Sequence, residues 1–360
     1  RSRSASQLSK EIDALGGEMN AFTTRETTTF YVKVLDQELP EAIKLLADLF
    51  HQSRFDAKEL EKEKQVVLEE IRMVQDDAED LVQDLHAAHI LGKHPLGRPI
   101  LGKPSIIRGL TRNDLVRYVQ HHYDSQSTVI AVAGNFEMAP TIKLLNTAFG
   151  RGPKGPVQSM RRVPPSIHSG LVVKQKKLEQ VHVCFGLPGV TAADPQRYAA
   201  HLANAVLGGS VSSRLFQEIR EKRGLAYSIY SYLSTFSDVG LLTVYAATRA
   251  QEVVRVVDLV RREVKRMSRQ GVEVEELARA KNQLKGGLML GLESSHSRMS
   301  KLAKDEFHYG RHSSLAEIAE SVDRISCDEV SAACERIFNC KNLGISVLGP
   351  VSGHALASIA

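Results

Sequence analysis

The sequence predicts an α+β protein of two structurally similar domains, each with a mixed or antiparallel β-sheet and helices packed on one face. The chain has 360 residues, and at about 150 residues per domain this length suggests two domains. A stretch rich in proline and basic residues, 151–170, divides the chain, and the segments on either side repeat one order of strands and helices. We therefore expect a first domain at 1–150, a linker at 151–170 and a second domain at 171–360.

Composition excludes several protein classes. Hydrophobic residues make up 42% and charged residues 25% of the chain, as in ordinary globular proteins. No apolar run approaches the ~18 residues that a membrane-spanning helix needs, so no span is expected. The 47 Lys and Arg residues exceed the 42 Asp and Glu residues by only five, and the basic residues are dispersed. Nucleic acid is therefore not an expected partner.

The predicted elements recur in the same order in the two halves. Each half has a strand-like run rich in β-branched, aromatic or leucine side chains, then a helix, then a second and longer helix. The predicted counterparts are 30–34 and 241–245 for the strands, 39–49 and 251–267 for the first helices, and 55–71 and 272–288 for the second helices.

A further pair of segments strengthens the case for a duplication. Residues 110–135 and 325–350 both read as a capped helix, a turn, a strand and a glycine. The offsets between the halves, 272 − 55 = 217 and 325 − 110 = 215, agree closely. Because the strands do not alternate regularly with helices, a mixed or antiparallel sheet is favoured over a doubly wound parallel one.

Common catalytic motifs do not identify a site. No P-loop, G-x-S-x-G or H-E-x-x-H occurs. The pairs His86/His89 and His121/His122 have the residue type of metal ligands, but neither has a suitable third ligand nearby, so surface or helix-capping roles are favoured. The cysteines contain no C-x-x-C pair and are expected to be free thiols in a reducing compartment: Cys184, Cys327, Cys334 and Cys340.

The most informative helix is predicted from about Asp56 to Val82. Glu63 and Glu70 lie seven residues apart, two turns along one face, at the edge of its apolar stripe. A carboxylate on a core-facing stripe is costly unless it is paired, hydrogen-bonded or bound to a metal. Periodicity alone leaves structural salt bridges as an equal alternative. The stripe itself consists of Leu60, Val67, Ile71 and Val74.

The repeat favours a functional role for the two carboxylates. The equivalent positions of the second half are Ala280 and Gly287, so the fold does not require carboxylates there. The second half has a different unusual feature, because Arg220 and Tyr227 flank the junction between a charged helix and a β-rich run. Arg and Tyr together can donate hydrogen bonds to a carbonyl oxygen. A surface Arg and a half-buried strand Tyr are the simpler interpretation of these two residues alone.

Several stretches together resemble the pitrilysin/insulinase family of zinc metallopeptidases, particularly bacterial processing proteases and the β-subunit of the mitochondrial processing peptidase. The resemblance extends over the whole chain and includes the duplication. The matching stretches are RSASQLSKEIDALGGEMNAFTTRETTTFYVKV, FDAKELEKEKQVVLEEI, HPLGRPILG and SSRLFQEIREKRGLAYS.

The resemblance implies a zinc site and assigns roles to the residues already noted. The family motif H-x-x-E-H supplies two zinc-binding His and a Glu that acts as general base, and a later Glu completes the site. Glu70 matches this third ligand, and Glu63 matches a supporting catalytic Glu. Arg220 and Tyr227 match the family's substrate-binding and catalytic Arg and Tyr.

The resemblance also implies how a peptide binds and which partners to expect. Family members hold the peptide as an added strand on a sheet edge, which matches Asn20, Ala21, Phe22 and Thr23. Zinc is the implied cofactor, and a peptide or protein is the implied substrate. A homodimer or a heterodimer with a related subunit is expected. The expected location is the bacterial cytoplasm, with the mitochondrial matrix as the alternative.

One departure from the family is severe, because no H-x-x-E-H occurs in these 360 residues. The chain begins Arg1-Ser2-Arg3-Ser4 without Met, so we expect the motif about ten residues upstream in a longer parent protein. As printed, the chain lacks two zinc ligands and the base, and is predicted not to cleave peptides alone. The alternative is a non-catalytic partner or scaffold subunit of the same family.

Overall fold

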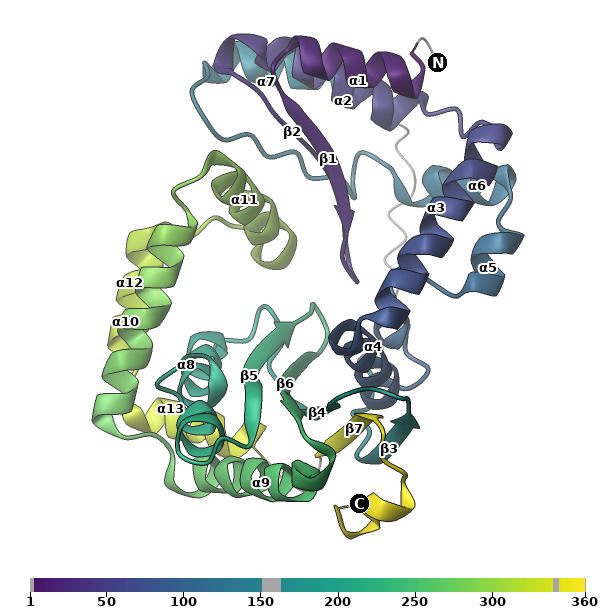
Figure 1. Ribbon diagram of the computed structural model, residues 1–360. Helices are drawn as coiled ribbons and strands as arrows, with labels where there is room; N and C mark the ends of the chain where they lie inside the picture. The colour runs from purple at the N-terminus through teal and green to yellow at the C-terminus, as the bar shows by residue number, and fades with distance from the viewer. Residues whose placement is uncertain (1–2, 151–162, 339–342, 360) are drawn as a thin grey trace. The chain divides into compact units, whose positions relative to one another are not determined.

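The computed structural model describes residues 3–150, 163–338 and 343–359 (Figure 1). The chain forms two compact units. The first comprises Arg1–Ile71, Ile100–Arg161 and Leu292–Phe307, and the second comprises Arg72–Pro99, Arg162–Gly291 and His308–Ala360. Most of the expected linker, 151–162, lies outside the described residues. The expected division of the chain at 151–170 stays a prediction.

The first unit contains a two-stranded antiparallel sheet and several helices. Its strands β1 and β2 pair from Glu18↔Lys33 to Thr23↔Thr28, and Thr24 N–H donates to Thr27 O at 2.8 Å in the turn. The elements are α1 (Ala5–Ala14), β1 (Glu18–Thr23), β2 (Thr28–Lys33), η1 (Asp36–Glu38), α2 (Leu39–Gln52), α3 (Ala57–Asp76), α5 (Pro104–Gly109), α6 (Arg112–His122), α7 (Met138–Phe149) and α11 (Ser295–Tyr309). Helices α3 and α11 each run past the boundary of the unit by a few residues.

The second unit is built on a five-stranded mixed sheet of order β3-β7-β4-β6-β5, in which only β3 and β7 are parallel. This sheet confirms the predicted α+β class. The elements are α4 (Ala78–Leu91), η2 (Pro95–Gly97), β3 (Gly170–Gln175), β4 (Val181–Pro188), α8 (Arg197–Gly208), η3 (Phe216–Glu221), β5 (Ala226–Thr235), β6 (Gly240–Thr248), η4 (Ala250–Glu252), α9 (Val253–Gln270), α10 (Val274–Gly291), α12 (Leu315–Arg324), α13 (Cys327–Ile337), β7 (Gly344–Gly349) and η6 (His354–Ile359).

Alternation along the strands sends side chains to two differently covered faces of this sheet. Val183 and Phe185 of β4 belong to the main core, which includes buried residues of α8, α9 and α13. Cys184 of β4 and Tyr245 of β6 face the other way and pack with Val82 of α4. Helix α4 therefore covers part of the second face, an addition that the sequence analysis did not include.

Polar contacts also hold α4 on the sheet. The hydroxyl groups of Tyr230 and Tyr232, on β5, donate to the side chains of Glu79 and Gln83 on α4. The sheet and α4 lie side by side in Figure 1. None of the described helices combines the length and the apolar character that crossing a membrane requires.

The matched capped helices are confirmed in both halves. Thr111 accepts a hydrogen bond from Asp114 N–H at the start of α6, and Ser326 accepts one from Glu329 N–H at the start of α13. In each case the acidic side chain accepts in return from the cap's own N–H, which completes a capping box.

Two local predictions are wrong. The helix expected from about Asp56 to Val82 is interrupted at Asp77, whose extended backbone ends α3 and whose carboxylate caps α4 by accepting from Asp80 N–H. The strand expected near residues 129–133 is not formed, whereas its counterpart β7 is. A strand requires ladder partners, and β7 lies between β3 and β4, whereas residues 129–133 have no such neighbours among the described residues.

Candidate functional site

The two carboxylates singled out on α3 are exposed, not directed into the core. Helix α3 buries Lys64, Leu68 and Ile71, while Glu63 and Glu70 lie on the flank of that buried face. The burial argument used for them in the sequence analysis is therefore wrong. The true centre of the stripe lies toward Lys64, because its aliphatic stem packs inward while its ammonium reaches Glu61 Oε1 at 2.6 Å.

Exposure leaves both carboxylates available. Neither Glu63 nor Glu70 forms a hydrogen bond or an ion pair with another residue in the part of the chain that the structure describes. The salt-bridge alternative therefore does not account for them, although a nearby carboxylate, Glu59, does pair with Lys62 at 2.7 Å. Seven residues of α-helix separate the two by about 10 Å along the axis.

The structure brings Arg220 and Tyr227 together within the second unit. The guanidinium carbon of Arg220 lies 5.0 Å from the centroid of the Tyr227 ring and 4.7 Å from that of Phe216. These distances are within the range of cation–π attraction. Tyr227 is 77% exposed, so its hydroxyl faces solvent rather than the half-buried environment of the simpler interpretation.

Phe216 is a neighbour that the sequence analysis missed. The spacing of Phe216 and Arg220, four residues apart in a helical segment, is a signal that such side chains meet on one face. It was readable in the sequence, because Arg220 lies at the end of the segment that was interpreted as a charged helix.

The proposed peptide edge, Asn20-Ala21-Phe22, lies in β1 of the first unit. Strand β1 pairs with β2 along one edge, and its other edge has no strand partner among the described residues. Asn20, Ala21 and Phe22 are all exposed. The Phe22 ring lies 6.3 Å from that of Tyr31 on β2. An exposed strand edge of this kind offers backbone donors and acceptors to an added strand.

The residues present do not complete a zinc site by themselves. Within residues 3–150, 163–338 and 343–359, no three His, Cys, Asp or Glu side chains are grouped so that they could hold a metal ion. A catalytic zinc site takes three protein ligands, and of those implied by the family resemblance this chain contains only Glu70. The described part of the chain therefore does not fit a bound zinc ion.

The cysteines do not change that conclusion. Cys184, Cys327 and Cys334 are free thiols, as expected, and Cys340 lies outside the described residues. Burial raises the pKa of the Cys334 thiol to about 12 and raises that of Cys184 as well. Thiols with raised pKa values are poor metal ligands and poor nucleophiles at neutral pH.

The histidine pairs differ from each other. His121 and His122 are exposed in the last turn of α6, as predicted. His86 is only 3% exposed and His89 is half-buried, and the Nδ1 atoms of both lie within 3.1 Å of Ser346 Oγ on β7. The surface or capping interpretation is therefore wrong for this pair. Burial, with a smaller contribution from His89, lowers the pKa of His86 to about 3.

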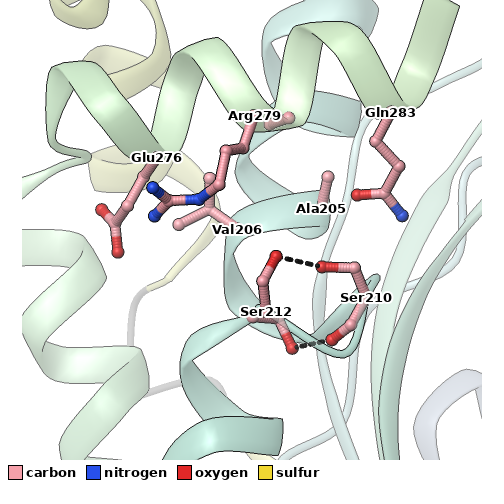
Figure 2. A pocket seen from close by; sticks show the side chains of 9 residues that line it. Ala205, Val206, Ser210, Ser212, Glu276, Arg279 and Gln283 are labelled. Atoms are coloured by element: carbon pink, nitrogen blue, oxygen red, sulfur yellow. Dashed lines mark hydrogen bonds between the residues drawn. The ribbon is translucent and has the colours of Figure 1, made fainter. Parts of the chain in front are cut away.

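A small cavity lies beside the turn that follows α8, against α10 (Figure 2). Its volume is about 20 Å³, enough for one or two waters and far too small for a peptide. Figure 2 shows Ser210 beside Ser212, with Oγ atoms 3.2 Å apart, and Gln283 on α10 donates to Gly209 O at 2.8 Å. These contacts fix the turn that leads into the segment of Phe216 and Arg220.

The sequence matches two family models and several curated proteins. Residues 1–104 match a family model described as insulinase (peptidase family M16), and residues 109–284 match one described as the peptidase M16 inactive domain. An uncharacterized zinc protease of Bacillus subtilis is 37% identical over 349 residues, covering 97% of this chain and 84% of the relative. An uncharacterized zinc protease of Streptomyces coelicolor is 38% identical, covering 98% of this chain and 78% of that protein.

Solved structures show the same fold at low identity. A peptidase M16 inactive domain from Pseudomonas fluorescens has a TM-score of 0.87 at 20% identity, covering 98% of this chain and 85% of that one. A protease from Helicobacter pylori also has a TM-score of 0.87, at 18% identity, with 97% and 86% covered. A chain of Complex III2 from Candida albicans has a TM-score of 0.84 at 23% identity, with 94% and 83% covered.

Proposed function

This chain belongs to the M16 (insulinase) peptidase family, and from this premise we propose that it is part of a zinc-dependent metalloendopeptidase that cleaves unfolded or presequence peptides. One observation carries the proposal. Arg220 is held against two aromatic rings while its N–H groups have no carboxylate partner in the described chain, beside the exposed Tyr227. A cation arranged in this way is suited to hold a peptide carbonyl oxygen.

In the proposal, residues of the two units have different roles in peptide binding and zinc ligation. Arg220 and Tyr227 donate hydrogen bonds to the substrate backbone, and the edge of β1 at Asn20-Ala21-Phe22 receives the peptide as an added strand. Glu70 offers one carboxylate ligand for zinc, supported by Glu63. When bound, the metal would polarise a water molecule and the scissile carbonyl. The two histidine ligands and the base are not in this chain, so the chain as printed is predicted to be inactive alone.

The proposed assembly is a homodimer or a heterodimer with a related subunit, in the bacterial cytoplasm. The bacterial origin of the Bacillus and Streptomyces relatives supports the location. The structural likeness to a chain of Complex III2 supports a role within an assembly.

A second function, a non-catalytic partner or scaffold subunit, has its own supporting observation. Residues 109–284 match a model described as the peptidase M16 inactive domain. In this role the chain would contribute peptide-binding surface only.

The deciding experiment uses the whole gene product as the cell makes it. We expect cleavage of a quenched fluorogenic peptide that stops with a zinc chelator and returns on adding zinc. Glu70→Gln should lower bound zinc at least tenfold, whereas the matched control Glu59→Gln, an exposed carboxylate on the same helix, should not. Cleavage that survives the chelator would refute the metallopeptidase. A whole gene product that binds the peptide without cleaving it would establish the scaffold function.

A further inference from the structure

The segment around Arg220 has an unusual backbone on both sides of that residue. Phe216–Glu221 forms a π-helical turn, in which Lys222 N–H donates to Gln217 O at 3.0 Å, five residues back. The following strand β5 carries a bulge, because Ala226 pairs with Thr248 and Ser228 with Ala247. Such π-turns and bulges redirect side chains and are frequent at functional sites.

The bulge explains why Tyr227 reaches Arg220. Tyr227 is the extra residue between the two ladder pairs, so its side chain is freed from the regular alternation of β5. Its ring turns to solvent and lies 5.0 Å from the Arg220 guanidinium carbon. The buried side chain of Ile219 holds the π-helical turn in place, and Leu225 N–H donates to Ile219 O at 3.0 Å.

The neighbouring charges leave Arg220 without an ion pair. Glu218 is taken by two other cations, Lys222 at 3.0 Å and Arg223 at 2.6 Å. Arg214 pairs with Glu276 at 2.6 Å. Among the described residues, the Arg220 guanidinium is therefore held by ring faces alone, and its N–H edge stays free for an acceptor that the chain does not supply.

We propose that Phe216 is a positioning residue, which holds the Arg220 guanidinium by its ring face so that the N–H edge is presented to the carbonyl oxygen of a bound peptide. This inference rests on the proposed function, because it assumes that Arg220 binds the peptide. Phe216 acts through Arg220, so its own contact with the peptide is not required. A freely rotating Arg side chain would lose conformational freedom on binding, and the ring removes part of that cost in advance.

The first test measures the geometry without a ligand. In a spectrum selective for arginine Nε–Hε groups, ring currents should displace the Arg220 resonance upfield, and its loss in Arg220→Lys assigns it. Phe216→Leu should move the resonance toward the ordinary arginine position, and Phe216→Tyr should keep it displaced. An unchanged resonance in Phe216→Leu would overturn the proposal.

The second test measures peptide affinity by fluorescence anisotropy with a short, unstructured, fluorescein-labelled peptide. Losing one partly exposed cation–π contact should weaken binding about two- to fivefold in Phe216→Leu. Phe216→Tyr should retain the affinity. The control Phe307→Leu, at an exposed phenylalanine elsewhere in the chain, should leave it unchanged.

A double-mutant cycle separates positioning from direct contact. In the Arg220→Ala background, Phe216→Leu should have no further effect, because there is no guanidinium left to position. The same two- to fivefold loss in that background would overturn the proposal and make Phe216 a direct peptide contact. If the wild-type chain binds no peptide, the proposed function fails for this chain, and the resonance of Arg220 alone decides whether Phe216 positions it.

Discussion

Acidification should destabilise the second unit through His86, the buried imidazole between α4 and the sheet. Its Nδ1 lies 3.0 Å from Ser346 Oγ, while its Nε2 is buried without a partner in the described chain. A proton on Nε2 would therefore create an unpaired buried charge. Burial and the neighbouring His89 lower the pKa of His86 from 6.5 to about 3.

The sign and size of the effect follow from this lowered pKa. In the folded state the imidazole of His86 stays neutral. Its contribution to the free energy of unfolding is therefore complete above pH 6.5, the ordinary pKa that applies to the unfolded chain, and falls as the pH drops toward about 3. Each pH unit in that window costs about 1.4 kcal/mol. Between pH 7 and pH 5, His86 alone should remove about 2 kcal/mol from the free energy of unfolding.

Urea unfolding followed by far-ultraviolet circular dichroism at pH 7, 6 and 5 provides the assay. His86→Gln should be less stable at pH 7, because the Ser346 contact is altered, but its free energy of unfolding should fall by about 2 kcal/mol less than wild type between pH 7 and pH 5. The matched control His121→Gln, on an exposed turn, should follow the wild-type profile. A His86→Gln profile as steep as wild type would refute the reasoning.

Three further outcomes are expected. Gly186→Ala should lower the free energy of unfolding by about 1–3 kcal/mol in the same urea assay, because the new Cβ would lie 2.6 Å from His86 Nε2. Ser326→Ala should cost about 1 kcal/mol by removing the cap of α13, again measured in urea. If the active site is shared across a dimer, mixing a Glu70→Gln whole gene product with an Arg220→Ala one should restore peptide cleavage that each lacks alone, and no rescue would argue against sharing.

Local patterns predicted the elements well where a pattern decides the structure. The run 241–245 lies in β6, a strand buried along its whole length, and the capped helices at Thr111 and Ser326 form as predicted. The interruption at Asp77 was also readable, because Asp is a preferred N-cap residue. Helix-forming residues continue on both sides of Asp77, and for this reason a single uninterrupted helix was predicted.

The errors came from features that depend on the folded neighbours. Periodicity identified a stripe on α3 but not its centre, because burial of the Lys64 stem depends on tertiary packing. The burial of His86 depends on the register that pairs Gly186 with Gly344, since two adjacent glycines leave room for the imidazole and its neighbours. The sequence of α4 alone does not show that the facing strands carry no side chains at these two positions, so it could not predict that His86 is buried.

The exposure of Glu63 and Glu70 on α3 favours a chemical role for these carboxylates over a role in stabilising the fold. Ala280, the predicted counterpart of Glu63, is 4% exposed in the core of the second unit, whereas Glu63 and Glu70 contact no partner in the described chain. Removing such surface charges usually changes the free energy of unfolding by less than about 0.5 kcal/mol. Stability therefore gives little reason for carboxylates at these two positions, and a ligand that arrives from outside the described residues gives one.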